Sequence, residues 1–156
     1  MRSGSLRRGY LGQDEMTEAA RIIAALGLQR HPEGGWYRQT WVGPEVGGRP
    51  TGTAIYFLLS AGEASHWHRV DADEIWLWHA GAALELRVSQ GAVAQVVRLG
   101  PDVLGPEVAQ FVVPNGWWQA ARSLGDWTLV SCTVSPGFRF EGFELAAVGF
   151  DIPVGA

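Results

Sequence analysis

Short stretches of apolar and β-branched residues recur along most of the chain and are separated by Gly, Pro and Asn turns. Alternation of apolar and polar residues predicts β-strands, because successive side chains of a strand point to opposite faces. The predicted strands are 31–41, 53–59, 64–70, 73–80, 82–88, 92–99, 107–114, 116–123 and 127–135, with one more at 139–148. Short strands at this spacing are typical of an antiparallel sandwich or barrel, so the sequence predicts an all-β fold.

A single helix is expected before the strands, from Asp14 to Leu26. Asp14 or Thr17 can cap its start, and Gly27 can close its end. Its apolar residues recur at helical spacing, at Ala19, Ile22, Ile23 and Leu26. Such an amphipathic helix is expected to lie against a sheet.

The length of 156 residues suits one domain with a sizeable core. We expect a flexible leader at 1–13, a single domain at 14–150 and a C-terminal tail at 151–156. The net charge of −4, without a basic block, argues against nucleic-acid partners. No apolar run reaches bilayer length, so no membrane partner is expected. The single cysteine, Cys132, fits a reducing compartment, and the cytoplasm is the expected location.

The stretch SHWHRVDADEIWLWH at 65–79 carries the candidate chemistry. His66 and His68 are two residues apart, so on a regular strand they share a face, and Glu74 on the next strand can join them. Two imidazoles and a carboxylate suit a first-row transition metal. The structural alternative is a histidine pair that only forms hydrogen bonds across the sheet. Trp76 and Trp78 share the parity of Glu74 and would line the same cavity.

The same stretch resembles the first signature of the cupin superfamily, which here reads Gly62, His66-x-His68, Glu74 and Gly81. Pro114-Asn115-Gly116 resembles the turn of the second signature, with Gln119 where a histidine is expected. Five residues separate His68 from Glu74, more than the signature usually has. The blocks HPEGGWYRQT, SHWHRVDADEIW, VVPNGWWQAA and GDWTLVSCTVSPGFRFEGFEL together resemble the Cupin_5 (DUF985) group over about residues 20–147.

The resemblance implies a double-stranded β-helix (jelly-roll) barrel, often a homodimer, with a small-molecule pocket inside one end. It also implies a divalent transition metal (Zn, Fe, Ni or Mn). The metal ligands carried over from the family would be His66, His68, Glu74 and Gln119. Because glutamine is a poor ligand beside imidazole, this set has three good donors.

Several other residues have a functional and a structural interpretation. Arg38 either pairs with an anionic ligand group inside the barrel or lies on the surface. Tyr56 is either a general acid or part of the core. Trp117 shares a face with Gln119, and both would then line an aromatic pocket with Trp76 and Trp78, unless the rings only fill the core.

Three functions remain open at this point. The first is an isomerase or epimerase acting on a sugar-like ligand, with His68 as base, helped by Glu74 or Tyr56. The second is a metal-dependent oxygenase or lyase that uses His66, His68 and Glu74. The third is a non-catalytic protein that binds a small molecule.

Overall fold

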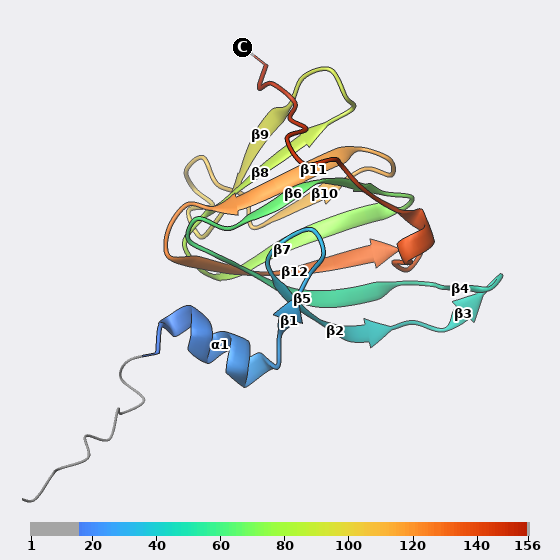
Figure 1. The fold of residues 1–156 in the computed structure, drawn as a ribbon, viewed down its shortest axis with the longest axis horizontal. Helices are drawn as coiled ribbons and strands as arrows, with labels where there is room; N and C mark the ends of the chain where they lie inside the picture. Colours follow the sequence, from blue (N-terminus) through green and yellow to red (C-terminus); the bar gives the residue numbers. More distant parts are fainter. Residues whose placement is uncertain (1–15, 156) are drawn as a thin grey trace, which may run out of the picture.

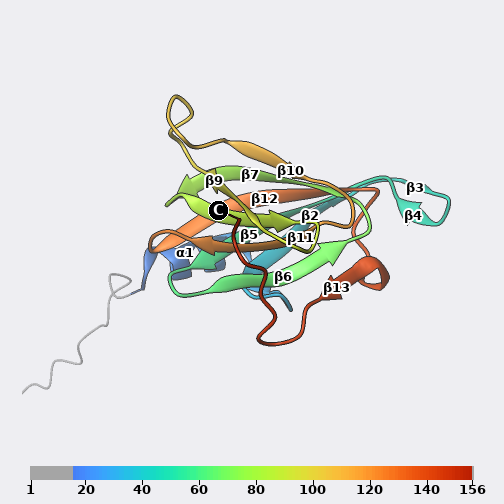
Figure 2. The same cartoon turned by 90° about the horizontal axis from the view of Figure 1, so that it is seen from above.

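In the computed structural model, which describes residues 16–155, the chain forms two antiparallel β-sheets that pack face to face (Figure 1). The first sheet contains, in order, β1 (Gln29–Arg30), β2 (Trp36–Val42), β5 (Thr53–Ser60), β12 (Trp127–Ser135), β7 (Asp73–Gly81) and β10 (Gln110–Val113). The second contains, in order, β13 (Phe143–Leu145), β6 (Ala64–Val70), β11 (Trp118–Ser123), β8 (Leu84–Ser89) and β9 (Gln95–Leu99). A hairpin of β3 (Glu45–Val46) and β4 (Arg49–Pro50) projects beyond the sheets (Figure 2).

The predicted all-β fold with one N-terminal helix is confirmed, and most strands lie where the alternation placed them. Several predicted strands are shorter than expected; β2 begins only at Trp36 and β9 only at Gln95. β10 uses only part of 107–114, and β13 starts late because a 3-10 turn, η2 (Phe140–Gly142), precedes it. The short strands β1, β3 and β4 were not predicted, since two residues carry no detectable alternation.

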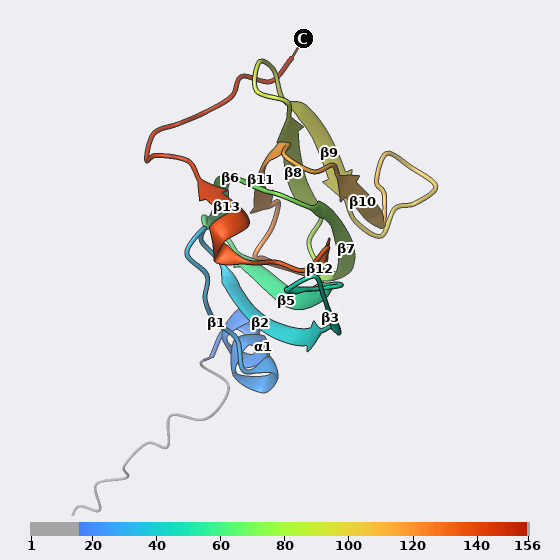
Figure 3. The same ribbon diagram turned by 90° about the vertical axis from the view of Figure 1, so that its right-hand side faces the viewer.

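The helix α1 (Glu18–Leu26) lies against the outer face of the six-stranded sheet (Figure 3). Thr17 is its N-cap: the side-chain oxygen accepts a hydrogen bond from the Ala20 amide at 3.1 Å. Gly27 ends the helix in the left-handed conformation, with φ of 64°. The helix thus begins later than predicted, and Asp14 and the predicted leader lie outside the described residues. No helix in residues 16–155 is long and apolar enough to cross a bilayer.

The core lies between the two sheets and is built from side chains that point inward from both. Trp76 is its largest member and is only 1% exposed. Around it lie Phe57, Leu59, Leu84, Leu86, Val88, Leu99 and Val130. Removal of this apolar surface from water, at about 25 cal/mol per Å², is the main force that holds the sheets together. This apolar core does not fill the whole space between the sheets, and polar side chains occupy one end of it.

The C-terminal segment packs on the outer face of the five-stranded sheet. The Trp67 indole donates to the Asp151 carboxylate at 2.9 Å, and Ile152 is 1% exposed. The Gly155 amide donates to the Ala94 carbonyl at 3.1 Å. The domain boundary predicted at residue 150 is therefore corrected: residues 151–155 belong to the packed domain.

Candidate functional site

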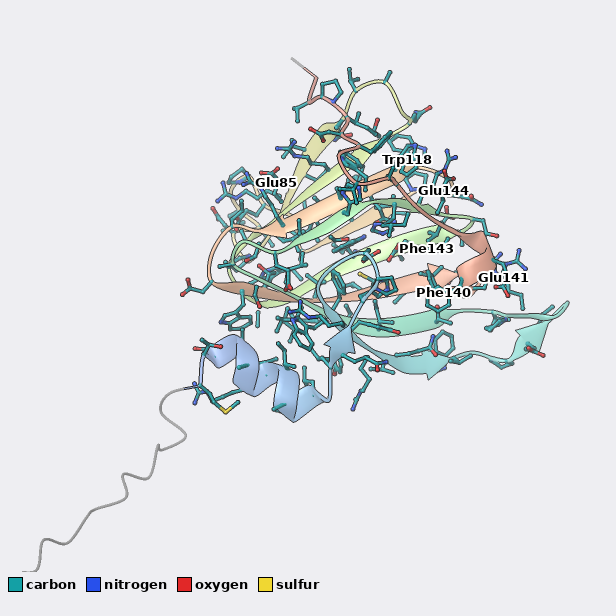
Figure 4. The ribbon with its side chains drawn as sticks, viewed as in Figure 1. Glu85, Trp118, Phe140, Glu141, Phe143 and Glu144 are labelled. Atoms are coloured by element: carbon teal, nitrogen blue, oxygen red, sulfur yellow. The ribbon has the colours of Figure 1, made fainter. Side chains whose placement is uncertain are left out.

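A cavity of about 250 Å³ lies between the two sheets. Two histidines and two glutamates line it: His31, Glu33, His68 and Glu74. The wall also includes the Tyr37 ring and the buried thiol of Cys132. Phe138 and Phe140, from the segment between β12 and β13, complete the lining; Figure 4 shows Phe140 with Phe143 on this side of the barrel.

A β-bulge in β6 decides which histidine enters the cavity. Along β11, Gln119 pairs with His68 and Ala121 pairs with Ser65. The chain therefore advances three residues in β6 over a length that takes two residues in β11. An extra residue reverses the side-chain alternation locally. His68 therefore points inward and is 2% exposed. His66 points to the outer face, where its Nε2 donates to the Ala147 carbonyl at 3.0 Å and the ring lines a separate groove. The prediction that both imidazoles share one face is wrong.

The His31-Pro-Glu-Gly-Gly turn brings Glu33 against this bulge. Gly34 and Gly35 have φ of 105° and 81°, a backbone conformation that favours glycine. A Cβ on Gly34 would lie 2.1 Å from the Ala64 carbonyl oxygen, so the turn lies directly against β6. The Glu33 carbonyl accepts a hydrogen bond from the His66 amide at 2.8 Å. The turn thus satisfies a backbone donor at the bulge and directs the Glu33 side chain into the cavity.

Glu33 and His68 form a buried ion pair. His68 Nε2 lies 2.9 Å from the Glu33 carboxylate, and Nδ1 donates to the His66 carbonyl at 2.8 Å. Burial disfavours the charged imidazole, but the nearby carboxylates of Glu33 and Glu74 outweigh it and raise the pKa of His68 to about 9. His68 is therefore an imidazolium at neutral pH with both ring N–H groups engaged. It is poorly placed to act as the base that the sequence suggested.

His31 lies beside this pair as a neutral ring. Its Nδ1 accepts a hydrogen bond from the Glu33 amide at 3.2 Å, so the ring proton is on Nε2. Burial lowers the pKa of His31 below its usual value, which overcomes the attraction of Glu33. Burial opposes ionisation of Glu33, but His68 lowers the pKa of the Glu33 carboxyl below its usual value. The cavity therefore pairs one fixed positive charge with one fixed negative charge.

Glu74 is the ionisable group whose proton is poised near neutral pH. Burial, with repulsion from Glu33, raises the pKa of Glu74 to about 7, although His68 opposes the shift. Gln119 donates its amide N–H to Glu74 at 2.8 Å, and its oxygen accepts from the Trp76 indole at 2.7 Å. Because an indole N–H can only donate, this chain fixes the orientation of the amide. Gln119 and Trp76 thus position Glu74 from behind the cavity wall.

The remaining predicted site residues lie elsewhere. Arg38 and Tyr56 pair across β2 and β5 on the outer face, and Tyr56 packs near α1. Trp78 and Trp117 pack against the core without lining the cavity. The expected placements of these four side chains inside the pocket are therefore corrected, since each points outward or fills the interior.

The predicted metal ligands do not converge. His66 lies on the opposite side of β6, and the Gln119 oxygen is occupied by the Trp76 indole. Within residues 16–155, no three His, Cys, Asp or Glu side chains are arranged to hold a metal ion. The donor set therefore does not fit the metal that the resemblance implies.

Three of the cavity residues, His31, Glu33 and Tyr37, were not predicted. The motif HPEGGWYRQT resembles a family block, but its sequence suggests only Arg38 as a ligand-binding residue. The alternation of side chains along the strand carries a signal for Tyr37. Tyr37 and Arg38 are consecutive, so they face opposite sides of the sheet and only one of them can point into the cavity. The position of Glu33 depends on contact between a turn and a bulge distant in sequence, which local pattern does not reveal.

The comparison with protein families decides the classification. The family model of Cupin_5 (DUF985), a family of the cupin superfamily, matches residues 20–146. The chain belongs to this family. This cupin is 40% identical to protein SO0799 from Shewanella oneidensis, with a TM-score of 0.80 over 85% of this chain and 86% of that one.

Other solved structures resemble this cupin more distantly. A hypothetical protein from Leishmania major is 33% identical, with a TM-score of 0.74 over 81% of this chain and 86% of that chain. Oxalate decarboxylase from Bacillus subtilis is 14% identical, with a TM-score of 0.59 over 74% of this chain and 29% of that chain, which shows the shared fold alone. The search of curated proteins finds no match.

Proposed function

We propose that this cupin is a proton-transfer enzyme of the isomerase or epimerase kind that acts on a small, sugar-like carbonyl compound. The observation that carries the proposal is the convergence of Glu74, the Glu33–His68 pair and Tyr37 on one cavity of about 250 Å³. Acid–base catalysis needs a group whose pKa lies near the working pH, inside a pocket that excludes bulk water. Glu74, with a pKa of about 7, meets this requirement.

The proposed step removes a proton from the carbon next to a carbonyl group. The C–H bond breaks, its proton goes to the Glu74 carboxylate, and the electron pair moves onto the carbonyl oxygen as an enolate. The Tyr37 phenol is the candidate hydrogen-bond donor that stabilises this developing negative charge, while the Glu33–His68 ion pair fixes the charge around Glu74. Return of the proton from Glu74 to the former carbonyl carbon gives isomerisation when the proton of the neighbouring substrate hydroxyl moves to the enolate oxygen. Return to the same carbon gives epimerisation when the enolate turns over in the cavity and presents its opposite face to Glu74.

This assignment exchanges the roles suggested by the sequence. Glu74 acts as base in place of His68, and Tyr37 replaces Tyr56. His68 and Glu33 are positioning residues that set the charge of the cavity. Within residues 16–155, no converging donor set supports the metal-dependent alternative. Binding without catalysis uses the same cavity and is distinguished by experiment.

The test is exchange of substrate hydrogen with solvent. Purified protein is incubated in D2O with a panel of aldoses and ketoses, and NMR follows loss of the signal from the hydrogen next to the carbonyl. We expect exchange with the wild type and at least a hundredfold loss with Glu74→Gln, a typical size for removal of a general base. Glutamine keeps an oxygen that can accept from Gln119, so the wall is preserved. Glu107→Gln, which changes a carboxylate paired with Arg98, is the matched control and should keep full exchange. Exchange that survives Glu74→Gln would contradict the proposal.

A further inference from the structure

We infer that the ligand of this cavity is a small uncharged compound, and that the cavity discriminates against carboxylates and phosphate esters. The inference rests on the proposed function for the choice of cavity, but it concerns binding and is tested separately from turnover. It follows from the charges and the shape of the lining.

Cationic partners for an anionic ligand are missing from the lining that the structure describes. The chain contains twelve arginines and no lysine, and none of the arginines in residues 16–155 lines the cavity. Most of these arginines are paired with carboxylates. Arg30 pairs with Glu63, Arg69 with Glu144, Arg87 and Arg122 with Glu85, and Arg98 with Glu107, while Arg49 and Arg139 share Asp71. A carboxylate or phosphate would find no guanidinium to replace its lost hydration.

The one cation that does line the cavity is already neutralised. Glu33 lies 2.9 Å from His68 Nε2, and the His66 carbonyl accepts from Nδ1. An anionic ligand would have to displace Glu33 to reach an imidazolium N–H. It would also approach Glu74, whose partial ionisation repels it. Both effects disfavour a negative charge inside the cavity.

The shape of the lining suits a compact molecule with one apolar face. Phe138, Phe140 and Tyr37 supply aromatic surface, on which the C–H face of a sugar-like ring can pack. Gln29, Gln39 and Thr53 supply neutral donors and acceptors for hydroxyl groups. The volume of about 250 Å³ lies below that of pockets for drug-sized ligands, which is roughly 300–1,000 Å³. A single-ring polyol, lactone or hydroxyketone matches these features.

The experiment compares matched sets of small compounds by ligand-observed NMR. Each set holds an uncharged monosaccharide, lactone or hydroxyketone with its carboxylate, phosphate-ester and amine counterparts. Val134→Trp fills the cavity and identifies binding that depends on it. We expect cavity-dependent binding of uncharged members at least tenfold tighter than that of their carboxylate and phosphate counterparts.

A charge introduced at the rim gives the converse test. Gln39 is exposed and lines the cavity, so Gln39→Arg adds the missing guanidinium with little risk to folding. We expect it to strengthen carboxylate binding about tenfold, as one charge-assisted hydrogen bond can. Gln95→Arg, at an exposed glutamine of β9 away from the cavity, is the matched control and should change nothing.

The outcomes separate this inference from the proposed function. Cavity-dependent binding of uncharged compounds without solvent exchange supports the inference and contradicts the catalytic proposal. Tighter binding or exchange of a carboxylate, phosphate ester or amine overturns the inference and leaves proton transfer standing. No cavity-dependent binding of any uncharged member also overturns it.

Discussion

At the scale of single residues, charge in the cavity is set by pairs rather than by individual groups. His68 stays protonated because Glu33 lies beside it, and Glu33 stays ionised because His68 does. The hydrogen-bond donor to Glu74 is the neutral amide of Gln119. Glu74 is therefore the cavity group that gains or loses a proton near neutral pH. The alternation of side chains along a strand predicts the inward position of His68. The role of Glu33 depends on a contact between segments distant in sequence, which no local pattern contains.

The Glu33–His68 pair predicts a pH dependence of stability. The folded pKa of His68, about 9, lies above its usual 6.5, so its stabilisation is complete below pH 6.5 and is lost as pH rises toward 9. The pKa of Glu74 is raised from 4.5 to about 7, so Glu74 adds a loss of stability in the same direction as pH rises from 4.5 to 7. We expect the melting temperature of the wild type to fall between pH 6.5 and 9, by an amount equivalent to a few kcal/mol.

The matched variants assign this fall to the pair. The double replacement Glu33→Gln with His68→Gln removes both charges together and should flatten the decline. His79→Gln, at an exposed histidine bonded to Ser131, should leave the decline as it is. Thermal melting across the pH series measures all three proteins. An unchanged slope in the double variant would show that the pair does not titrate as described.

At the scale of elements, the alternation of apolar residues predicted the strands well because each sheet buries one face. It failed at β6, where one extra residue turns His66 outward. The bulge depends on the pairing of β6 with β11 and on the hydrogen bond that the His66 amide donates to the Glu33 carbonyl. Neither contact can be predicted from the sequence of one strand. Likewise, the sequence leaves open whether Arg38 and Tyr56 face the cavity, because the elements that pack on a strand decide its faces; Tyr56 packs with α1 on the outer face.

The turn at Gly34 is expected to be sensitive to a single methyl group. Gly34→Ala brings a Cβ to 2.1 Å from the Ala64 carbonyl oxygen and adds backbone strain at φ of 105°. We expect a loss of at least ~3 kcal/mol in the free energy of unfolding. Gly48→Ala has similar strain, at φ of 82°, but open space, and should lose only about 1–2 kcal/mol. Equal losses in denaturant titrations would argue against close packing of the turn on β6.

The segment that carries Phe138 and Phe140 is held over the cavity by Asp71. This carboxylate accepts from Arg49 at 2.7 Å and from Arg139 at 3.0 Å, and Arg49 also donates to the Gly137 carbonyl at 2.8 Å. Asp71→Asn should therefore speed hydrogen exchange in residues 138–142 and weaken ligand binding, with a stability loss of about 1 kcal/mol or less. Glu107→Gln should not affect exchange in that segment. Unchanged exchange in Asp71→Asn would show that the ion pairs do not restrain it.

At the scale of the whole molecule, the two sheets enclose one core and one cavity, and the C-terminal segment lies on the outside. Membership of the Cupin_5 family was predictable because several long sequence blocks occur in order. The contents of the cavity were less predictable, because they are assembled from both sheets and from two loops.

The homodimer expected from the family resemblance stays a prediction for this protein. Light scattering after size-exclusion chromatography should give twice the chain mass of 16.9 kDa. The dimer mass should persist in Val134→Trp, because that substitution lies in the cavity wall rather than on the surface. A mass of a single chain at micromolar concentration would contradict the expectation.

The most direct test of the site is an NMR titration that follows the Glu74 carboxyl carbon and the His68 ring nitrogens in the same sample. Signals are assigned with Glu74→Gln and with the Glu33→Gln, His68→Gln double variant. The account predicts that Glu74 titrates near pH 7 and His68 near pH 9. Titration of Glu74 near 4.5 and of His68 near 6.5 would contradict it, because both groups would then behave as ordinary solvent-exposed side chains.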